Sequence, residues 1–312
     1  MKKNILCITP ITHLPGVFEE LKKYGNITYM PNIKSTGLRQ ILKEKNFNAI
    51  FVNPNKQGFK IGKKILMNTN LEVINTCSTG TNHIDLEFCN NNKIKIWSLT
   101  NDYQLIKKLP STSELAFGLM ILLLRKIIFA HNSVSNYKWD YLPYIGNQIE
   151  NLKIGVVGYG RLGKIFCKQL EGFNANITIC DPYVKNTPYK NLELRKLAKK
   201  VDVLVLHLHV KSETKGFINE EIIKSMKKGS IIINTSRGEL VDENAILKYL
   251  KLKHLGGYGT DVLTNEFDNI KKSKLIKYVK KLPIVITPHI GGMTIQGQTK
   301  AFMHAVKKFR KL

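Results

Sequence analysis

Cysteine and tryptophan are scarce in this chain of 312 residues, which holds five and two of them respectively. The cysteines are odd in number and widely separated, and none forms the CxxC pair of a zinc or redox motif. Neither a disulfide framework nor a zinc site is therefore predicted, and reduced thiols in a cytoplasm are expected. The five positions are Cys7, Cys77, Cys89, Cys167 and Cys180.

Long hydrophobic runs are also missing. The longest, residues 115–130, is interrupted by Arg125 and Lys126. It is shorter than the roughly 20 residues that cross a bilayer, so we predict a buried helix there rather than a membrane span. The first ten residues indicate a charged tip that runs into a short strand without a small-residue cleavage site, and no signal peptide is expected.

Acidic residues are few, since 23 Asp and Glu stand against 49 Lys and Arg, which gives a formal net charge of +26. Such a charge can attract nucleic acid or an anionic membrane. The lysines are spread along the whole chain, however, and no basic run is interleaved with aromatic residues. We interpret them as solvated surface residues whose field helps to gather anionic ligands, and expect neither nucleic acid nor membrane as a partner.

Short apolar runs alternate with amphipathic segments along the chain, whose length and 43% apolar content suit two globular domains. This alternation predicts α/β architecture with parallel sheets covered by helices on both faces. The pattern restarts after Gly146, so we expect two doubly wound units joined by a long helix from residue 113 to about 133. Strands are predicted at residues 4–8, 49–52, 71–76, 93–99, 153–157, 177–180, 201–208, 230–234, 257–262 and 284–287.

A glycine-rich segment, Gly158-Tyr159-Gly160-Arg161-Leu162-Gly163, matches the pattern G-x-G-x-x-G. Three glycines can simply form a turn, but here an apolar strand precedes them and a helical pattern follows. Glycines let the backbone approach a pyrophosphate, and a helix N-terminus offers free N–H groups with partial positive charge. We predict a dinucleotide site at this turn.

Asp181 ends the next predicted strand, 18 residues beyond Gly163 (181 − 163). This is close to the spacing of about 20 residues expected for the carboxylate that binds a ribose hydroxyl. A carboxylate accepts hydrogen bonds from a free 2′-hydroxyl and repels a 2′-phosphate, so NAD is preferred over NADP. Lys185 lies nearby in the sequence and softens that preference.

Three further segments place polar residues beyond predicted strand ends, where open α/β sheets bind their ligands. Arg237 follows strand 230–234, Glu266 lies in the loop after strand 257–262, and His289 follows strand 284–287 and a proline. No spacing typical of metal ligands occurs, so no metal is predicted.

Together these segments resemble the D-isomer-specific 2-hydroxyacid dehydrogenase family, which includes phosphoglycerate dehydrogenases and glyoxylate/hydroxypyruvate reductases. The resemblance covers essentially the whole chain, and Arg237, Glu266 and His289 are separated by 29 and 23 residues, as is usual in the family. It implies a Rossmann NAD-binding domain and a flavodoxin-like substrate domain. The matching segments are residues 78–85, 158–163, 206–207, 235–238, 261–266 and 288–292.

The resemblance also implies a reaction, the interconversion of a small 2-keto acid and its D-2-hydroxy acid with NAD. His289 would protonate the carbonyl oxygen as hydride arrives, and take the proton back in oxidation. Glu266 would pair with it, because a carboxylate favours the imidazolium form and fixes the ring. Arg237 would hold the substrate carboxylate, which suits its planar fork. Further substrate contacts implied are the backbone N–H groups of Ser78, Thr79 and Gly80.

For the cofactor, the resemblance implies that Asp261 reaches the nicotinamide end and that Thr235 and Ser236 line its pocket. His209 stands where the family usually has proline, and we weigh a contact with NAD against a structural role. His83 is interpreted as structural. The expected cofactor-binding set is Gly158, Gly160, Arg161, Leu162, Gly163, Asp181, His209, Thr235, Ser236, Arg237, Asp261, His289, Gly291 and Gly292.

The expected substrate domain is discontinuous, with residues 1–100 joined by residues 288–312, and the NAD-binding domain is residues 101–287. A C-terminal helix at 298–312 would fold back on the N-terminal unit. Family members usually form homodimers through the NAD-binding domain, and the apolar helix at 115–130 is the expected contact. Substrate specificity is assigned to residues 53–56, 78–79 and 139–144. Phe267 stands where the family usually has proline, which predicts a looser loop after Glu266.

Two other functions fit parts of the sequence. An NAD(H)-sensing regulator similar to a corepressor would suit the charge of +26, but a pure sensor has no need for the set of Arg237, Glu266 and His289. A phosphite-oxidising enzyme of the same family would carry a lysine near residue 76, where this chain has Thr76-Cys77-Ser78. The dehydrogenase is therefore the leading hypothesis.

Overall fold

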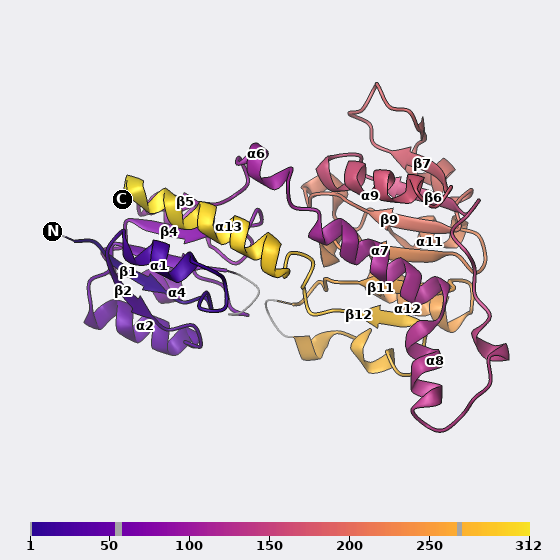
Figure 1. Cartoon of the computed structure of the whole chain (residues 1–312), viewed down its shortest axis with the longest axis horizontal. Coiled ribbons are helices and arrows are strands. Elements are labelled where there is room, and N and C mark those ends of the chain that lie inside the picture. The colour runs from indigo at the N-terminus through magenta and orange to yellow at the C-terminus, as the bar shows by residue number, and fades with distance from the viewer. Residues whose placement is uncertain (1, 54–57, 267–269) are drawn as a thin grey trace. The chain divides into compact units, whose positions relative to one another are not determined.

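The computed structural model describes residues 2–53, 58–266 and 270–312, which fold into two compact units (Figure 1). The first unit comprises Met1–Leu109 and Gly292–Leu312, and the second comprises Pro110–Gly291. Each is built on a parallel sheet flanked by helices, which confirms the predicted fold class. Among the residues described, no helix combines the length and the apolar character that a membrane span needs.

The first unit has a five-stranded parallel sheet within the described residues. Strand β3 lies at its centre, and the strand order reverses at β1, which pairs with β2 on one side and with β3 on the other. In spatial order the strands are β2 (Asn26–Tyr29), β1 (Asn4–Cys7), β3 (Ala49–Val52), β4 (Val73–Thr76) and β5 (Lys95–Trp97).

The helices of the first unit come from both ends of the chain. The C-terminal helix α13 (Ile295–Lys307) packs against α1 (Val17–Lys22), so the predicted return of the C-terminus is confirmed (Figure 1). Its Phe302 ring contacts Phe51 of β3 with centroids 6.1 Å apart. The other α-helices among the described residues are α2 (Ser35–Glu44), α4 (Lys63–Leu66), α5 (Leu86–Asn91) and α6 (Tyr103–Ile106).

The second unit has a seven-stranded parallel sheet within the described residues. Both faces of this sheet are covered by helices, because its strands are apolar on both sides. In strand β9, Val203 and Val205 enter one hydrophobic cluster while Leu204 and Leu206 enter another. In spatial order the strands are β12 (Ile284–Ile286), β11 (Gly257–Thr260), β10 (Ile231–Asn234), β9 (Val203–Leu206), β6 (Lys153–Val157), β7 (Asn176–Cys180) and β8 (Lys190–Asn191).

The strand order of the second unit reverses at β6, which pairs with β7 on one side and with β9 on the other. Ligands of open α/β sheets bind at such a switch point, beyond the carboxyl ends of the strands. The glycine-rich turn follows β6 directly, so it lies at this point. The helices of the unit are α7 (Ser111–Leu124), α8 (Ile127–Val134), α9 (Arg161–Glu171), α10 (Leu194–Ala198), α11 (Glu220–Ser225) and α12 (Glu243–Lys251).

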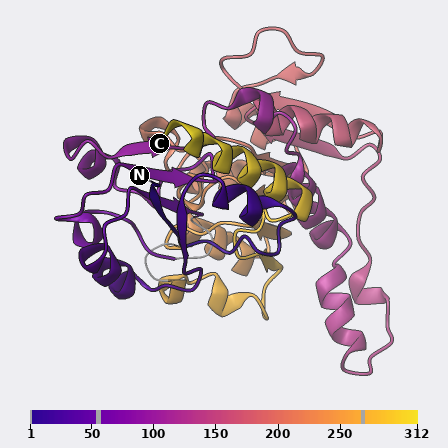
Figure 2. The same cartoon turned by 60° about the vertical axis from the view of Figure 1, so that its left-hand side comes forward.

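The single long helix predicted from residue 113 to about 133 is wrong, because the chain forms two helices, α7 and α8. Lys126 has a left-handed backbone conformation (φ 52°) and breaks the helix where two charged residues interrupt the apolar run. The chain returns at Asn147, whose N–H is donated to the Leu124 carbonyl at 3.0 Å. We call the segment between these points, residues 126–146, the arm. It contains α8 and stands away from the body of its unit (Figure 2).

Candidate active site

The turn after β6 has glycines where side chains cannot fit. Gly158 has φ +92°, and a Cβ atom there would lie 2.4 Å from the His207 carbonyl oxygen. A Cβ atom at Gly163 would lie 2.0 Å from the Gly158 carbonyl oxygen, so this glycine lets α9 pack against the turn. Beside Gly160 the space is open, since a Cβ atom there would meet no described atom within 4 Å. The turn therefore leaves its backbone accessible to a phosphate at the N-terminus of α9.

Asp181 lies directly after β7 and is held in a fixed orientation. One carboxylate oxygen accepts the Tyr159 N–H of the glycine-rich turn at 2.8 Å, and the other accepts the Tyr183 N–H at 3.0 Å. The Lys211 ammonium lies over the Tyr183 ring, 5.6 Å from its centroid. The carboxylate is thus fixed next to the phosphate turn, as a ribose-binding residue would require.

Two histidines follow β9 and differ in their surroundings. The His207 ring is buried, and neither of its nitrogens has a hydrogen-bond partner among the residues that the structure describes. The His209 side chain lies closer to solvent, and partial burial followed by the charges of Arg237, Arg161 and Lys211 lowers its pKa. Three cationic side chains therefore act on the surroundings of His209, which favours an anionic ligand there.

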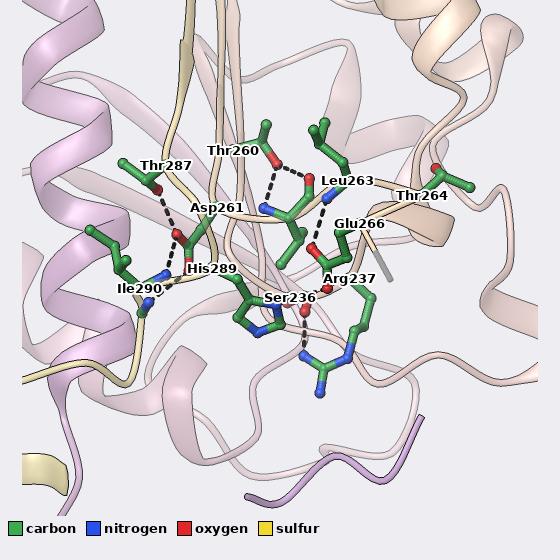
Figure 3. Close-up of polar contacts among 12 residues, drawn as sticks. Ser236, Arg237, Thr260, Asp261, Leu263, Thr264, Glu266, Thr287, His289 and Ile290 are labelled. Atoms are coloured by element: carbon green, nitrogen blue, oxygen red, sulfur yellow. Dashed lines mark hydrogen bonds and ion pairs between the residues drawn. The ribbon is translucent and has the colours of Figure 1, made fainter. Parts of the chain in front are cut away.

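His289 and Glu266 form a close pair at the carboxyl ends of β12 and β11 (Figure 3). The His289 Nδ1 atom lies 2.8 Å from Glu266 Oε1, and only 23% and 15% of the two side chains are exposed. The second carboxylate oxygen of Glu266 accepts the Leu263 N–H at 3.1 Å. Glu266 is therefore anchored by its own loop while it orients the imidazole.

Asp261 holds the loop that carries His289 (Figure 3). It is buried, and its carboxylate accepts the Thr287 hydroxyl at 2.5 Å and the N–H groups of Ile290 and Gly291 at 2.8 and 2.7 Å. These bonds support a left-handed backbone at His289 (φ 54°), a strained conformation for this residue type. Burial raises the pKa of Asp261 despite these bonds.

Arg237 leaves the end of β10, and its guanidinium and the His289 ring project toward the same side of the strand ends (Figure 3). One of its nitrogens donates to the Ser236 carbonyl at 2.6 Å. Ser236 itself is buried and donates its hydroxyl to the Leu206 carbonyl of β9 at 2.8 Å. The Thr235 hydroxyl is buried too and has no hydrogen-bond partner in the described part of the chain.

The predicted carboxylate-binding loop, Ser78 to Gly80, belongs to the first unit and follows β4. The Ser78 hydroxyl donates to the Gly80 carbonyl at 2.5 Å and lies 3.0 Å from the Thr76 hydroxyl. Thr76 in turn lies 3.1 Å from a ring nitrogen of His83, which is buried. His83 thus supports the loop from behind, which agrees with a structural role.

Some of the predicted site residues lie in the other unit, in the arm or outside the described residues. Gly292 belongs to the first unit and Gly291 to the second. Of the expected specificity segments, Asn53 is buried, residues 54–56 are outside the described residues, and residues 139–144 lie in the exposed arm. Phe267 is outside the described residues as well. Thr287 and Glu243, whose contacts support the His289 and Glu266 loops, were missed, because nothing in the sequence shows which loops meet at the strand ends.

The fold and these residues define a two-unit α/β protein with a glycine-rich turn at the switch point of one sheet and a close His289–Glu266 pair beyond its strand ends. The profile of the D-isomer specific 2-hydroxyacid dehydrogenase family, NAD binding domain, matches residues 117–291, and that of its catalytic domain matches residues 8–104. The chain belongs to this family, and its cofactor is NAD.

Several known proteins are similar. The D-3-phosphoglycerate dehydrogenase of Bacillus subtilis is 28% identical over 74% of this chain, which spans only 43% of that relative. The hydroxypyruvate reductase of Thermotoga maritima is 30% identical over 78% of each protein. The crystal structure of the TT0316 protein from Thermus thermophilus superposes with a TM-score of 0.83 at 25% identity, covering 98% of this chain and 96% of the other.

Proposed function

We propose that this protein reduces a small 2-keto acid to its D-2-hydroxy acid with NADH and catalyses the reverse oxidation with NAD. This proposal is supported mainly by the pairing of His289 Nδ1 with Glu266 Oε1 at 2.8 Å. Arg237, which follows β10, projects toward the same side of the strand ends (Figure 3). The relatives named above support the reaction class, since one is called a hydroxypyruvate reductase and another a D-3-phosphoglycerate dehydrogenase.

The acid–base step follows from the orientation of the His289 ring. Because Nδ1 faces Glu266, Nε2 is the ring nitrogen that gives its proton to the substrate oxygen in reduction and takes it back in oxidation. The Glu266 carboxylate stabilises the imidazolium that exists before this transfer. The strained backbone at His289, held by Asp261, fixes the position of the ring.

Arg237 binds the substrate carboxylate and polarises the adjacent carbonyl group, because its planar guanidinium can donate two parallel hydrogen bonds. Arg161 and Lys211, which together with Arg237 lower the pKa of His209, reinforce this attraction. The contribution of Ser78, Thr79 and Gly80 to carboxylate binding stays a prediction, since these residues belong to the other unit.

NAD supplies the hydride chemistry when bound, and the chain offers suitable residues for it. The open space beside Gly160 and the N-terminus of α9 suit the pyrophosphate. Asp181 suits the ribose hydroxyls, so NAD is preferred over NADP. The buried hydroxyl of Thr235 suits the nicotinamide end, because it lacks a partner in the described residues.

One experiment separates this proposal from its alternative. Purified protein is mixed with NADH and, in turn, with glyoxylate, pyruvate and hydroxypyruvate, and the loss of NADH absorbance is followed. Turnover of at least one acid is expected. No turnover on any of them, together with tight and salt-dependent DNA binding, would instead support an NAD(H)-sensing regulator.

We further propose that the protein is a homodimer and that the arm forms part of the contact. The arm carries large apolar side chains in solvent, among them Tyr137, Trp139 and Tyr141, which are 101%, 92% and 76% exposed. Exposed apolar side chains gathered in this way mark association surfaces. A triple variant with Trp139→Ser, Tyr141→Ser and Leu142→Ser should be a monomer of about 35.6 kDa, half the mass of the parent dimer. Light scattering that gives equal masses for both would contradict the assignment.

A further inference from the structure

Glu243 is a half-buried carboxylate in a protein where basic residues outnumber acidic ones by about two to one. Between residues that the structure describes, no ion pair includes it. Burial raises its pKa, as do Glu239 and Glu266 nearby. The dipole of α12 favours an acidic residue in its first turn, but Glu243 also makes contacts outside this helix.

Capping of α12 does not account for the contacts of the Glu243 carboxylate. It is the first residue of α12, but Asp242 already caps that helix by accepting the N–H groups of Asn244 and Ala245 at 2.9 and 3.1 Å. The Glu243 carboxylate reaches the loop after β11 instead. Its Oε1 atom accepts both the backbone N–H and the hydroxyl of Thr264, at 2.9 and 3.1 Å.

A continuous chain of contacts leads from this point to the imidazole. Thr264 follows Leu263, whose N–H is donated to Glu266 Oε2 at 3.1 Å. The other carboxylate oxygen of Glu266 lies 2.8 Å from His289 Nδ1 (Figure 3). The turn at 263–266 therefore sets the position of Glu266, and Glu243 ties that turn to α12.

The peptide bond between Leu263 and Thr264 also lies against the segment that carries Arg237. Gly238 follows that arginine, and a Cβ atom at Gly238 would lie 2.2 Å from both the Leu263 carbonyl carbon and the Thr264 nitrogen. The two loops are thus in direct backbone contact where Glu243 holds Thr264. A displaced turn would disturb the positions of Glu266 and Arg237 together.

We propose that Glu243 is a positioning residue, which holds Thr264 and thereby keeps Glu266 against His289. This inference rests on the proposed function, because it concerns the same acid–base pair. A glutamine at 243 retains an acceptor oxygen for both Thr264 bonds, whereas an alanine loses it. Asp242 provides a matched control, since Asp242→Ala weakens the N-terminus of the same helix without touching the turn.

The test compares the parent with Glu243→Ala, Glu243→Gln and Asp242→Ala in three measurements. These are keto-acid reduction on the glyoxylate, pyruvate and hydroxypyruvate panel, NADH binding by fluorescence, and hydrogen exchange of the Leu263 amide. Glu243→Ala should lower kcat by about ten- to hundredfold at unchanged NADH affinity. It should also speed exchange at Leu263 by about tenfold, because the bond to Glu266 opens more often. Glu243→Gln should restore both values to near those of the parent.

Asp242→Ala should lower the Tm and leave kcat and the Leu263 exchange rate unchanged at a temperature where the protein is folded. Equal effects of Glu243→Ala and Asp242→Ala would overturn the inference, because helix stability alone would explain them. Unchanged Leu263 exchange in Glu243→Ala would overturn it too. A parent without turnover on any keto acid would refute the proposed function, while Leu263 exchange would still decide whether Glu243 positions Glu266.

Discussion

His207 yields a quantitative prediction about stability in acid. Its ring is buried next to Phe166, with ring centroids 5.2 Å apart, and its nitrogens lack hydrogen-bond partners among the described residues. Burial, and to a smaller degree the charge of Arg161, lowers the pKa of His207 from 6.5 to about 3. The folded protein therefore keeps this imidazole neutral where an unfolded chain protonates it.

The sign of the effect follows from proton linkage. Because the folded state binds fewer protons at His207, the stability that this group contributes is complete above pH 6.5 and is lost as the pH falls from there toward about 3. At pH 5 the loss amounts to about 2 kcal/mol, since one pH unit below the unfolded-state pKa corresponds to about 1.4 kcal/mol.

The variant His207→Leu tests this, because leucine has a similar volume and does not titrate. Hydrogen exchange of the β9 amides, corrected for intrinsic rates, gives the free energy of opening of the second unit. Between pH 7.5 and pH 5 that free energy should fall by about 2 kcal/mol less in the variant than in the parent. His13→Leu, which removes an exposed histidine of the first unit, is the control and should follow the parent. A parallel decline in parent and His207→Leu would refute the reasoning.

Other predictions concern the cofactor site. Gly158→Ala should lower the Tm and abolish NADH binding, because its Cβ atom would lie 2.4 Å from a backbone oxygen. Gly160→Ala should keep the Tm and weaken only NADH binding, because the space beside it is open. Thermal melts and fluorescence titration distinguish the two variants, and equal losses of Tm would contradict this expectation. Asp181→Ala should raise the affinity for NADPH relative to NADH by about tenfold or more, since it removes the charge that repels a 2′-phosphate; an unchanged ratio in the same titrations would show that another residue selects the cofactor.

Much of the fold could be predicted from the sequence because buried parallel strands are continuous apolar runs. Strands such as β10, with three isoleucines, agree with the prediction to within two residues at each end. The edge strands β2 and β8 were missed, since β8 has only two residues, Lys190 and Asn191, and both are exposed. A short polar edge strand is stabilised by pairing with its neighbour rather than by its own apolar pattern.

The break between α7 and α8 depended on contacts distant in the sequence. Lys126 adopts a left-handed conformation in a chain that returns so closely that a Cβ atom at Gly146 would lie 2.1 Å from the Leu124 carbonyl oxygen. The residues around the break do not predict that the chain will return to Leu124. The candidate site shows the same division. Motifs in the sequence single out Arg237, Glu266 and His289, whereas the contact of Glu243 with Thr264 becomes visible only when the two loops are placed side by side.

The proposal that His289 donates the proton can be tested with one variant. His289→Ala is compared with the parent on a keto acid that the parent reduces, with NADH binding measured in parallel. The variant should lose kcat by at least about a hundredfold, the scale of a general acid, at nearly unchanged NADH affinity. A variant that binds NADH and still reduces the acid at the parent rate would contradict it.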